Sequence, residues 1–575
     1  MEKRIIIAIA LSVLILLAFR YFEERRMAEL GRLRPPVQKQ ASKTAESAPE
    51  IPAAPVLAPA AGPATPAQAT PEAPEQNAPS PGDTSATAKA LLVEGSLYRA
   101  AVDNRGALLT SWELKQYKSV SGQTFEMIAA MHDAETRPYP GSLIFDDPAL
   151  TTLANNEFYE VQISDHGGTG EKLAPPVTVT LRLRRGDLAI EKRYHFEKDN
   201  YLVDFSAAMD KGGKPLSARL MLGQDIGPEQ EHLISRSPQV EAVSYRGGKV
   251  VRDGPPKDEN EIRRIGGDIR WVGLDMQYFA IIAIPPRSIE GFDLQKRPVK
   301  TVGLDGKEVS RDLLKLTIPT VGQAKYEVYL GPKRQSYLEA VKSVGLSGVI
   351  DYGMFSFLVI PLLASLKFIF QYVHNYGAAI ILLTFLLTLL LFPFRLKQML
   401  SMKKMQVVQP KIKEIQEKYK RYKKTDPKRA AMNQEIMAIY KEHNVNPLGG
   451  CLPLILQMPL LFAFYSLLAA SIELRQAPFM GWIHDLSIKD PYYILPIVMG
   501  ITMLISQKMT PMTPGTDPTQ AKMMMVMPVV FTFMFLNVSS GLNLYFLCSN
   551  IFQIGFQKIA ERWVGGGQSA NKAKP

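Results

Sequence analysis

The 575-residue sequence predicts a multi-domain membrane protein with an α-helical bundle of five core transmembrane helices, an N-terminal anchor helix and an antiparallel β-sandwich domain. Three observations support this prediction. Several apolar segments in the second half are long enough to cross a bilayer. A stretch of the first half alternates apolar and polar residues, which is typical of half-buried strands. The net charge of +12 is concentrated in one basic segment between apolar ones.

The first 22 residues predict a membrane anchor. Lys3 and Arg4 precede an apolar run from Ile5 to Phe19, and no small-residue cleavage site follows. The next segment contains 12 prolines between Pro35 and Pro81 among many alanines, which favours an extended spacer without a core. We therefore assign residues 1–22 to an uncleaved anchor and residues 23–89 to a disordered linker.

Residues 90–335 predict the β-sandwich. The segment Val177–Arg184 alternates with period two, a turn follows at Arg185–Asp187, and a second strand runs through Phe196. The sequence of this region shows no nucleophile-and-base spacing, metal motif or phosphate loop. His195 lies in a strand, where a structural histidine is the more common case. We therefore predict no enzymatic activity, no metal and no cofactor.

The basic segment fixes the predicted topology. Residues 395–429 contain 13 Lys or Arg and three acidic residues, and the positive-inside rule places them in the cytoplasm. If the anchor runs outward, only one crossing can separate the sandwich from this segment. Residues 352–373 contain Lys367 and Pro361, whereas 380–394 is uncharged, so the former segment should lie flat at the outer interface. The remaining predicted regions are an interfacial helix region (336–375), a transmembrane helix (376–395), a cytoplasmic helical hairpin (396–446), four transmembrane helices (447–558) and a basic cytoplasmic tail (559–575).

The last two predicted spans are short. Residues 523–538 and 542–557 share a three-residue turn, and each has 16 residues. At 1.5 Å per residue each would cover about 24 Å, less than a hydrocarbon core of about 30 Å. Such spans imply local thinning of the bilayer or burial among partner helices.

Polar residues inside the spans are the candidate site, because they are costly in lipid and tend to face protein or water. Asn543, Asn550 and Gln557 recur every seven residues on the last span. The other candidates are Thr384, Thr388, Gln457, Tyr545 and Gln553. They could line one hydrophilic cavity or could hold the bundle together by interhelical hydrogen bonds. No acidic residue lies deep in a span, which argues against a proton- or cation-coupled pump.

The basic segment also has a helical seam. Apolar and aromatic residues recur at alternating spacings of three and four before Asp426–Pro427, which predicts a helix start, and the pattern then resumes. The pattern therefore predicts an antiparallel helical hairpin. This hairpin could fix the membrane topology and contact lipid, or it could dock a partner or an incoming chain. Its seam includes Met405, Val408, Ile412, Ile415, Tyr419, Tyr422, Met432, Ile436, Ile439 and His443.

Several motifs together resemble the YidC membrane protein insertases of the bacterial inner membrane. Trp271–Gly273, with Tyr278–Phe279, and Tyr329–Lys333 are similar to marks of the family's periplasmic domain. The motifs of the second half are Val445–Cys451, Leu456–Pro459, Glu473–Pro478, Trp482–Leu486, Asp490–Pro496 and Ser540–Tyr545.

The resemblance implies an insertase that needs no nucleotide, with a water-filled groove open to the cytoplasm and the lipid. By family position Thr384, Gln457 and Tyr545 would line this groove, together with Thr388, Asn550 and Gln553 on the same polar stripes. The hairpin, with Met405, Ile412, Tyr419 and Ile436, would capture substrate. The implied partners are nascent membrane proteins, the Sec translocon, the ribosome and membrane lipids, with no nucleic-acid function beyond ribosome contact. The protein would be multi-pass in the inner membrane, with both termini in the cytoplasm. Its large domain would lie in the periplasm and would resemble sugar-mutarotase folds.

One position departs from the family pattern. The family usually places an arginine five residues before the proline that ends the first core span, and counting back from Pro393 gives Thr388. Arg395, seven residues further on, would lie about 10 Å nearer the cytoplasm. We therefore predict that Arg395 substitutes in part for this arginine, as a cation at the groove mouth; a hydrated groove without a fixed charge is the alternative.

Two other function classes remain open from the sequence. A small-solute transporter also uses broken helices and polar stripes, although the spans show no internal repeat. A membrane-anchored carbohydrate enzyme would place its activity in the sandwich, where no convincing acid–base pair appears. Solute flux through liposomes tests the first class, and deletion of residues 90–320 tests the second.

Overall fold

The computed structural model describes residues 89–128, 137–165, 172–228, 240–302, 308–420, 422, 428–443, 452–509 and 518–571. These residues all lie within one compact unit, Asp83–Pro575. The predicted anchor, almost all of the linker, Asp426–Pro427 and the motif Val445–Cys451 lie outside the described residues.

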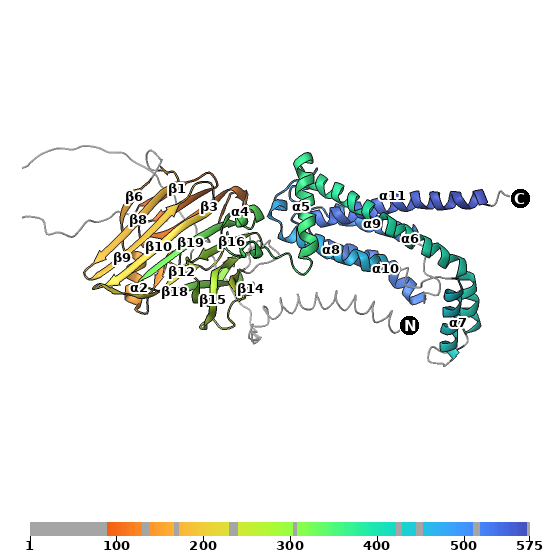
Figure 1. The fold of residues 1–575 in the computed structure, drawn as a ribbon, viewed down its shortest axis with the longest axis horizontal. Coiled ribbons are helices and arrows are strands. Elements are labelled where there is room, and N and C mark those ends of the chain that lie inside the picture. Colours follow the sequence, from red (N-terminus) through yellow and green to blue (C-terminus); the bar gives the residue numbers. More distant parts are fainter. Residues whose placement is uncertain are drawn as a thin grey trace, which may run out of the picture. The chain divides into compact units, whose positions relative to one another are not determined.

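The first half forms two β-sheets, with the small helix α2 (Pro148–Asn156). Figure 1 shows the long strands running side by side. The smaller sheet has the order β4-β3-β2-β1-β7, with β1 and β7 parallel and the other pairs antiparallel. Its strands are β4 (Thr124–Glu126), β3 (Leu108–Lys118), β2 (Tyr98–Asp103), β1 (Ala90–Glu94) and β7 (Lys172–Leu173).

The larger sheet has 14 strands, and its main path is β5-β12-β18-β17-β15-β16-β19-β10-β9-β8-β6. The predicted hairpin is confirmed, because β8 pairs with β9 in antiparallel register around a turn in which Gly186 has a φ of +58°. The strands are β5 (Leu143–Ile144), β6 (Glu160–Ser164), β8 (Val177–Arg185), β9 (Leu188–Phe196), β10 (Leu202–Lys211), β11 (Lys214–Pro215), β12 (Ser217–Gly223), β13 (Glu241–Arg246), β14 (Lys249–Asp253), β15 (Ile262–Asp275), β16 (Phe279–Ile284), β17 (Ile289–Val302), β18 (Glu308–Val321) and β19 (Gln323–Pro332).

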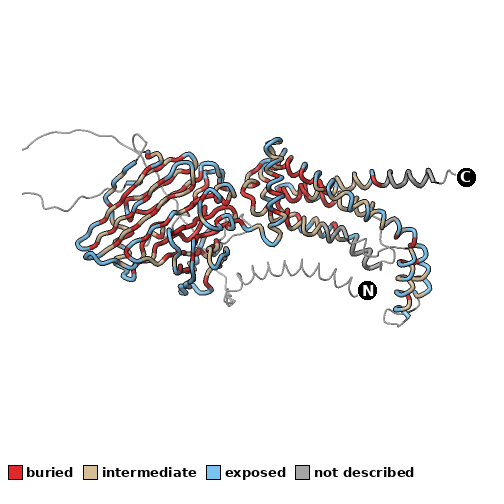
Figure 2. Tube along the Cα trace, in the orientation of Figure 1, coloured by how far each residue is buried: buried red, intermediate tan, exposed pale blue. Residues whose placement is uncertain are grey.

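An aromatic core lies inside this domain. Trp112 stacks on Tyr98 with ring centroids 4.1 Å apart, and both side chains are fully buried. Figure 2 shows buried and less buried positions following one another along the strands, as the period-two pattern requires. The predicted β-sandwich region is therefore β-rich, with one continuous apolar core.

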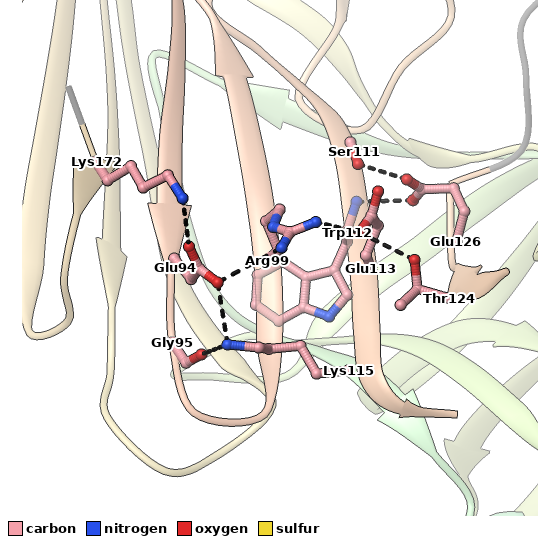
Figure 3. Close-up of polar contacts among 10 residues, drawn as sticks. All are labelled: Glu94, Gly95, Arg99, Ser111, Trp112, Glu113, Lys115, Thr124, Glu126 and Lys172. Carbon is pink, nitrogen blue, oxygen red and sulfur yellow. Dashed lines mark hydrogen bonds and ion pairs between the residues drawn. The ribbon is translucent and has the colours of Figure 1, made fainter. Parts of the chain in front are cut away.

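Charged side chains on neighbouring strands of the smaller sheet pair with one another, as Figure 3 shows. Glu94 contacts the Nζ atoms of Lys115 at 3.2 Å and Lys172 at 3.3 Å. Hydrogen bonds from Lys115, and then from Lys172, lower the pKa of Glu94 to about 2. Glu126 instead bonds to the backbone: its carboxylate accepts hydrogen bonds from the N–H groups of Trp112 and of Ile128. These charges are accounted for by local structure.

A short connection leads from the sheets to the helical half of the chain. It contains α4 (Gln335–Ala340) and the 3₁₀ turn η1 (Leu346–Val349). Trp271 Nε1 donates to the carbonyl oxygen of Val344 at 2.9 Å. Lys333 Nζ lies 2.6 Å from Asp275, and both side chains are buried. Asp275 also accepts a hydrogen bond from Arg252 Nε at 3.0 Å, so this carboxylate is shared by two cations at the end of β19, where the chain leaves the sheet.

The second half is helical, with a separate apolar core. Two described stretches, Ser356–Val373 and Tyr376–Ser401, are long and apolar enough to cross a membrane, and three shorter apolar stretches are Gln457–Ala470, Ile494–Met509 and Met525–Phe535. The elements are α5 (Ser356–Val373), α6 (Tyr376–Lys418), α7 (Lys428–Glu442), α8 (Leu452–Ala470), η3 (Ile472–Leu474), α9 (Ile494–Met509), α10 (Pro518–Phe535) and α11 (Ser540–Asn571).

Two predicted boundaries fall inside continuous helices. The change from membrane span to hairpin at residues 395–396 lies within α6, which passes Pro393 and Pro410 without interruption. The predicted tail from residue 559 is helical as far as Asn571, because α11 continues beyond its apolar part. A proline removes only one helical hydrogen bond, so flanking turns can carry the helix past it.

The helix α5 differs from its neighbours in direction. Only His374 and Asn375 connect it to α6, and His374 has a left-handed backbone with φ of +52°. Figure 1 shows α5 crossing the end of the bundle, whereas α6, α8 and α9 run along it. Its buried side chains Val359, Leu363 and Leu366 pack into the bundle core, while Phe357 and Phe368 are exposed.

Candidate functional site

Arg395 is the one cation among the candidate site residues, and it lies in α6 two residues after Pro393. Its Nη2 donates to Oε1 of Gln457 in α8 at 3.2 Å. With the Gln553 carboxamide oriented so that its oxygen faces the guanidinium, this oxygen accepts from Nη1 at 3.2 Å and from Nη2 at 3.1 Å. That orientation is required, since a guanidinium only donates hydrogen bonds. Three helices therefore meet at one half-buried guanidinium.

Gln457 extends this contact towards the interior. Its Nε2 lies 3.5 Å from the hydroxyl of Tyr545 in α11. The Tyr545 ring is buried and stacks on Phe464 of α8, with centroids 4.0 Å apart. Gln457 is thus held between a fixed phenol and the guanidinium of Arg395. Its carboxamide suits both, because it presents a donor and an acceptor.

Gln553 of α11 completes this contact, and Asn550 lies three residues earlier on the same side of that helix; we call Arg395, Gln457, Asn550 and Gln553 the polar cluster. Asn550 Nδ2 is buried and has no hydrogen-bond partner among the described residues. Ser549, which the sequence analysis did not single out, donates to the Gln553 oxygen at 3.0 Å. Its only signal in the sequence is its position four residues before Gln553, one helical turn away. The cluster contains donors in excess and no acidic side chain.

The two threonines of α6 behave differently. Thr384 Oγ1 donates to the carbonyl oxygen of Ile380 at 2.6 Å, and Thr388 Oγ1 donates to that of Thr384 at 2.7 Å. Both side chains are buried. Each hydroxyl donor is therefore satisfied within its own helix, as is common for threonine in apolar surroundings. They lie on the same helix as Arg395, and within the described part of the chain neither hydroxyl bonds to a residue of the cluster.

The remaining polar stripe of α11 joins helices to one another. Asn543 Nδ2 contacts the carbonyl oxygens of Phe535 and Val538 at 3.2 Å, which fixes the turn between α10 and α11. Gln557 Nε2 donates to the carbonyl oxygen of Met509 at the end of α9 at 3.0 Å. The seven-residue stripe thus has two parts: Asn543 and Gln557 bond to neighbouring helices, and Asn550 belongs to the polar cluster.

The predicted hairpin has a core of its own. Met405 and Ile412 of α6 are buried against Tyr440 of α7, and Ile436 packs against the same core. The Tyr419 hydroxyl donates to Glu435 at 2.7 Å. These four predicted capture residues therefore lie between the two helices. Tyr440, which the spacing pattern missed, also belongs to this seam.

Two titratable side chains of the sandwich have local structural partners. His195 Nδ1 lies 2.8 Å from Thr178 Oγ1 on the adjacent strand, a cross-strand structural contact. Lys192 is fully buried, donates to the carbonyl oxygen of Gly106 at 2.7 Å, and has its pKa lowered to about 7 by burial. Within the described ranges no three His, Cys, Asp or Glu residues are grouped so that they could hold a metal ion.

Known proteins match both halves of the chain. The family model described as the 60Kd inner membrane protein matches residues 368–566, and the YidC periplasmic domain matches residues 91–365. A membrane protein insertase YidC from Syntrophus aciditrophicus is 38% identical, covering 97% of this chain and 99% of that protein. The chain belongs to the YidC family of membrane protein insertases. A YidC of Geotalea daltonii is 35% identical over 97% of this chain and 98% of its own length.

A solved YidC insertase structure, in which the first transmembrane domain is resolved, aligns with 82% of this chain and 93% of its own length, with 16% identity and a TM-score of 0.35. As a member of the YidC family, the chain is an inner-membrane protein with a β-rich periplasmic domain and a helical transmembrane region. Membership confirms the family and insertase function that the motifs predicted.

Proposed function

We propose that this YidC protein inserts nascent membrane proteins by receiving their polar flank at the cluster of Arg395, Gln457, Asn550 and Gln553. The apolar segment of the client would then pass into the lipid beside α6. The supporting observation is the surroundings of Arg395. Its hydrogen-bond partners are neutral carboxamides, and no carboxylate of the described residues lies within ion-pair distance of it.

A half-buried cation without a counter-charge is costly in a membrane protein and marks a candidate functional site. A client carboxylate would supply that charge, and the unpartnered Nδ2 of Asn550 could donate a further hydrogen bond to it. Arg395 would thus serve as the cation that the family usually places at the position occupied here by Thr388. The satisfied hydroxyls of Thr384 and Thr388 would line the inner end of the path without holding the client.

We further propose the topology that the charge pattern predicts, with six spans, both termini in the cytoplasm and α5 flat at the periplasmic interface. The exposed Phe357 and Phe368 and the direction of α5 support the last point. The hairpin of α6 and α7 would meet the client first, with Met405, Ile412, Tyr419 and Ile436 holding its helices together. The ribosome, the Sec translocon and anionic lipids are the partners that suit its basic surface.

The test is insertion into liposomes that contain only this protein. A short single-span client with an acidic tail is added, and insertion is scored as protection of the tail from protease. We expect Arg395→Gln to lower protection about five- to ten-fold, because one charge-assisted hydrogen-bond pair is lost. Arg395→Lys should retain part of the activity, since it keeps the charge without the planar fork.

Two controls make this test specific. The exposed Lys413 on the same helix offers Lys413→Gln, which removes the same charge away from the cluster and should leave protection unchanged. A client whose acidic residues are replaced by Gln should be indifferent to Arg395→Gln. Absence of any insertion by the folded wild-type protein would contradict the proposed function, whereas equal insertion by wild type and Arg395→Gln would contradict only the role of Arg395.

A further inference from the structure

The two carboxamides beside Arg395 occupy its N–H groups unequally. The Gln553 oxygen accepts from Nη1 at 3.2 Å and from Nη2 at 3.1 Å, so it binds the fork at the end of the guanidinium. The Gln457 oxygen accepts from Nη2 alone, at 3.2 Å. Because one proton of Nη2 already points into the end fork, the proton that meets Gln457 is the one beside Nε. Nε has no hydrogen-bond partner among the described residues, so the side fork of Nε and Nη2 is only half occupied.

Gln553 is the fixed partner of the guanidinium. Its oxygen also accepts from Ser549 Oγ at 3.0 Å, one turn earlier on the same helix. Three donors thus converge on one oxygen atom, and two of them belong to Arg395. A rotation of this carboxamide would break all three hydrogen bonds at once. Gln553 therefore keeps the guanidinium in one place, with its side fork directed to Gln457.

Gln457 is held more loosely and has an alternative partner. It accepts one hydrogen bond from Arg395, and its Nε2 lies at the long distance of 3.5 Å from the hydroxyl of Tyr545. The Tyr545 ring is buried and stacks on Phe464, so the position of this hydroxyl is fixed. Within the described part of the chain, the hydroxyl has no acceptor for its own proton. If the carboxamide of Gln457 turned away from Arg395, its oxygen could accept that proton.

A carboxylate suits the side fork better than a carboxamide does. Its two equivalent oxygen atoms match Nε and Nη2 in two parallel, charge-assisted hydrogen bonds. It would also supply the negative charge that the neutral partners of Arg395 lack. Displacement of Gln457 breaks one hydrogen bond to the guanidinium, whereas displacement of Gln553 breaks two and leaves Ser549 without its acceptor. Gln457 is thus the partner that a carboxylate replaces.

We propose that Gln457 is the exchangeable partner of Arg395 and that Gln553 is the residue that positions this cation. The inference rests on the proposed function, because the incoming carboxylate belongs to the polar flank of a client. An acidic side chain binds the side fork, and Gln457 turns to the hydroxyl of Tyr545. A neutral flank leaves the contact between Arg395 and Gln457 in place. Gln457 therefore competes with the client and selects acidic over neutral flanks.

The experiment measures binding of a labelled peptide to the full-length protein in uncharged detergent. The peptide is the acidic tail of the client, and its reference is the same peptide with glutamine at each acidic position. Gln457→Met removes the competing oxygen and should strengthen binding of the acidic peptide about three- to ten-fold, the effect of one hydrogen bond. Gln553→Met removes the fixed partner and should weaken this binding by a similar factor.

Further variants separate exchange at Arg395 from general effects on folding. Gln457→Glu places a carboxylate beside the side fork and should remove the preference for the acidic over the glutamine peptide. Gln371→Glu, at an exposed position of α5, adds the same charge away from the cluster and should leave that preference unchanged. In the Arg395→Gln background the gain from Gln457→Met should disappear, which a purely structural role of Gln457 would not produce. The melting temperature of each variant checks that the protein is folded.

Weaker binding of the acidic peptide to both methionine variants would overturn the proposal, because neither carboxamide would then be exchangeable. A preference that survives Gln457→Glu, or a gain from Gln457→Met that persists without Arg395, would overturn it as well. Liposome insertion of the client is measured in parallel with the same variants. Insertion by the wild type without opposite responses of the two methionine variants overturns this inference only. Opposite responses without any insertion contradict the proposed function and support the exchange at Arg395.

Discussion

At the scale of single residues, the sandwich contains a buried amine, Lys192, whose protonation is expected to lower stability. Lys192 has its pKa lowered from 10.5 to about 7 by burial. Between these values the unfolded chain holds more protons than the folded one, so folding becomes more favourable as the pH rises from about 7 towards 10. We expect this gain to be on the order of 2–4 kcal/mol in the free energy of unfolding.

The substitution Lys192→Met removes the titrating group and should abolish this gain. It leaves the carbonyl oxygen of Gly106 without its donor, which costs about 1–3 kcal/mol at every pH. Urea unfolding of the full-length protein in detergent, followed by tryptophan fluorescence, measures both variants at pH 7 and pH 10. Lys211→Met, at an exposed lysine of β10, is the control. A constant difference between wild type and Lys192→Met at both pH values would contradict the prediction.

At the scale of elements, the hairpin depends on its buried seam. Ile412 is fully buried between α6 and α7, whereas Val407 on the same helix is exposed. Truncation of a buried isoleucine to alanine costs about 2–5 kcal/mol. We therefore expect Ile412→Ala to accelerate hydrogen exchange of α7 by more than ten-fold. Val407→Ala should leave that exchange unchanged, and equal acceleration by the two variants would show that the hairpin has no such seam.

A close helix contact gives a second prediction at this scale. A Cβ atom added at Gly500 of α9 would lie 2.1 Å from Thr532 Oγ1 of α10, whereas one at Gly555 of α11 would meet no atom within 4 Å. Gly500→Ala should therefore lower the melting temperature in detergent, because α9 and α10 must separate or Thr532 must turn away. Gly555→Ala should maintain or raise it, by helix propensity of about 1 kcal/mol. A lower melting temperature for Gly555→Ala alone would contradict this packing.

The sequence predicted elements well where one periodicity dominates. The hairpin of β8 and β9 and the seam through Met405 and Ile412 followed from spacings of two and of three and four. The continuity of α6 did not follow, because Pro393 and Pro410 resemble helix ends when only the local chain is considered. The contact between Arg395 and Gln553 joins residues 158 positions apart. Such proximity depends on helix packing, which local pattern does not encode.

At the scale of the whole molecule, contacts outside the polar cluster join the sheets to the helices. The Arg475 guanidinium lies 5.3 Å from the ring centroids of Phe125 and of Phe279, and Gln476 Nε2 donates to the carbonyl oxygen of Lys118 at 2.9 Å. Gln277 Nε2 donates to the carbonyl oxygen of Ala469 at 3.0 Å. The polar cluster, in contrast, is built only from α6, α8 and α11.

Deletion of residues 90–320 should therefore leave insertion of the acidic-tailed client largely intact. The deletion removes the partners of Arg475 and Gln476, so we expect a lower yield or melting temperature. Protease protection per molecule of folded protein is the measurement, and Arg395→Gln in the deleted background should lower it as in the full chain. Complete loss of insertion by a folded deletion variant would place the essential chemistry in the sandwich.

The unbroken course of α6 also has a mechanical meaning. Lys404 and Arg395 are nine residues apart on one helix, about 13 Å, with no loop between them. A force applied to the hairpin would therefore be transmitted along the rigid helix to the guanidinium of Arg395. Pro393 has no amide proton to donate to the carbonyl group of Leu389, so α6 lacks one helical hydrogen bond directly beside Arg395, as it does further out at Pro410. Bending at Pro393 would move the guanidinium relative to α8 and α11, so a force on the outer end of α6 would change the geometry of the cluster at which we propose that the client binds.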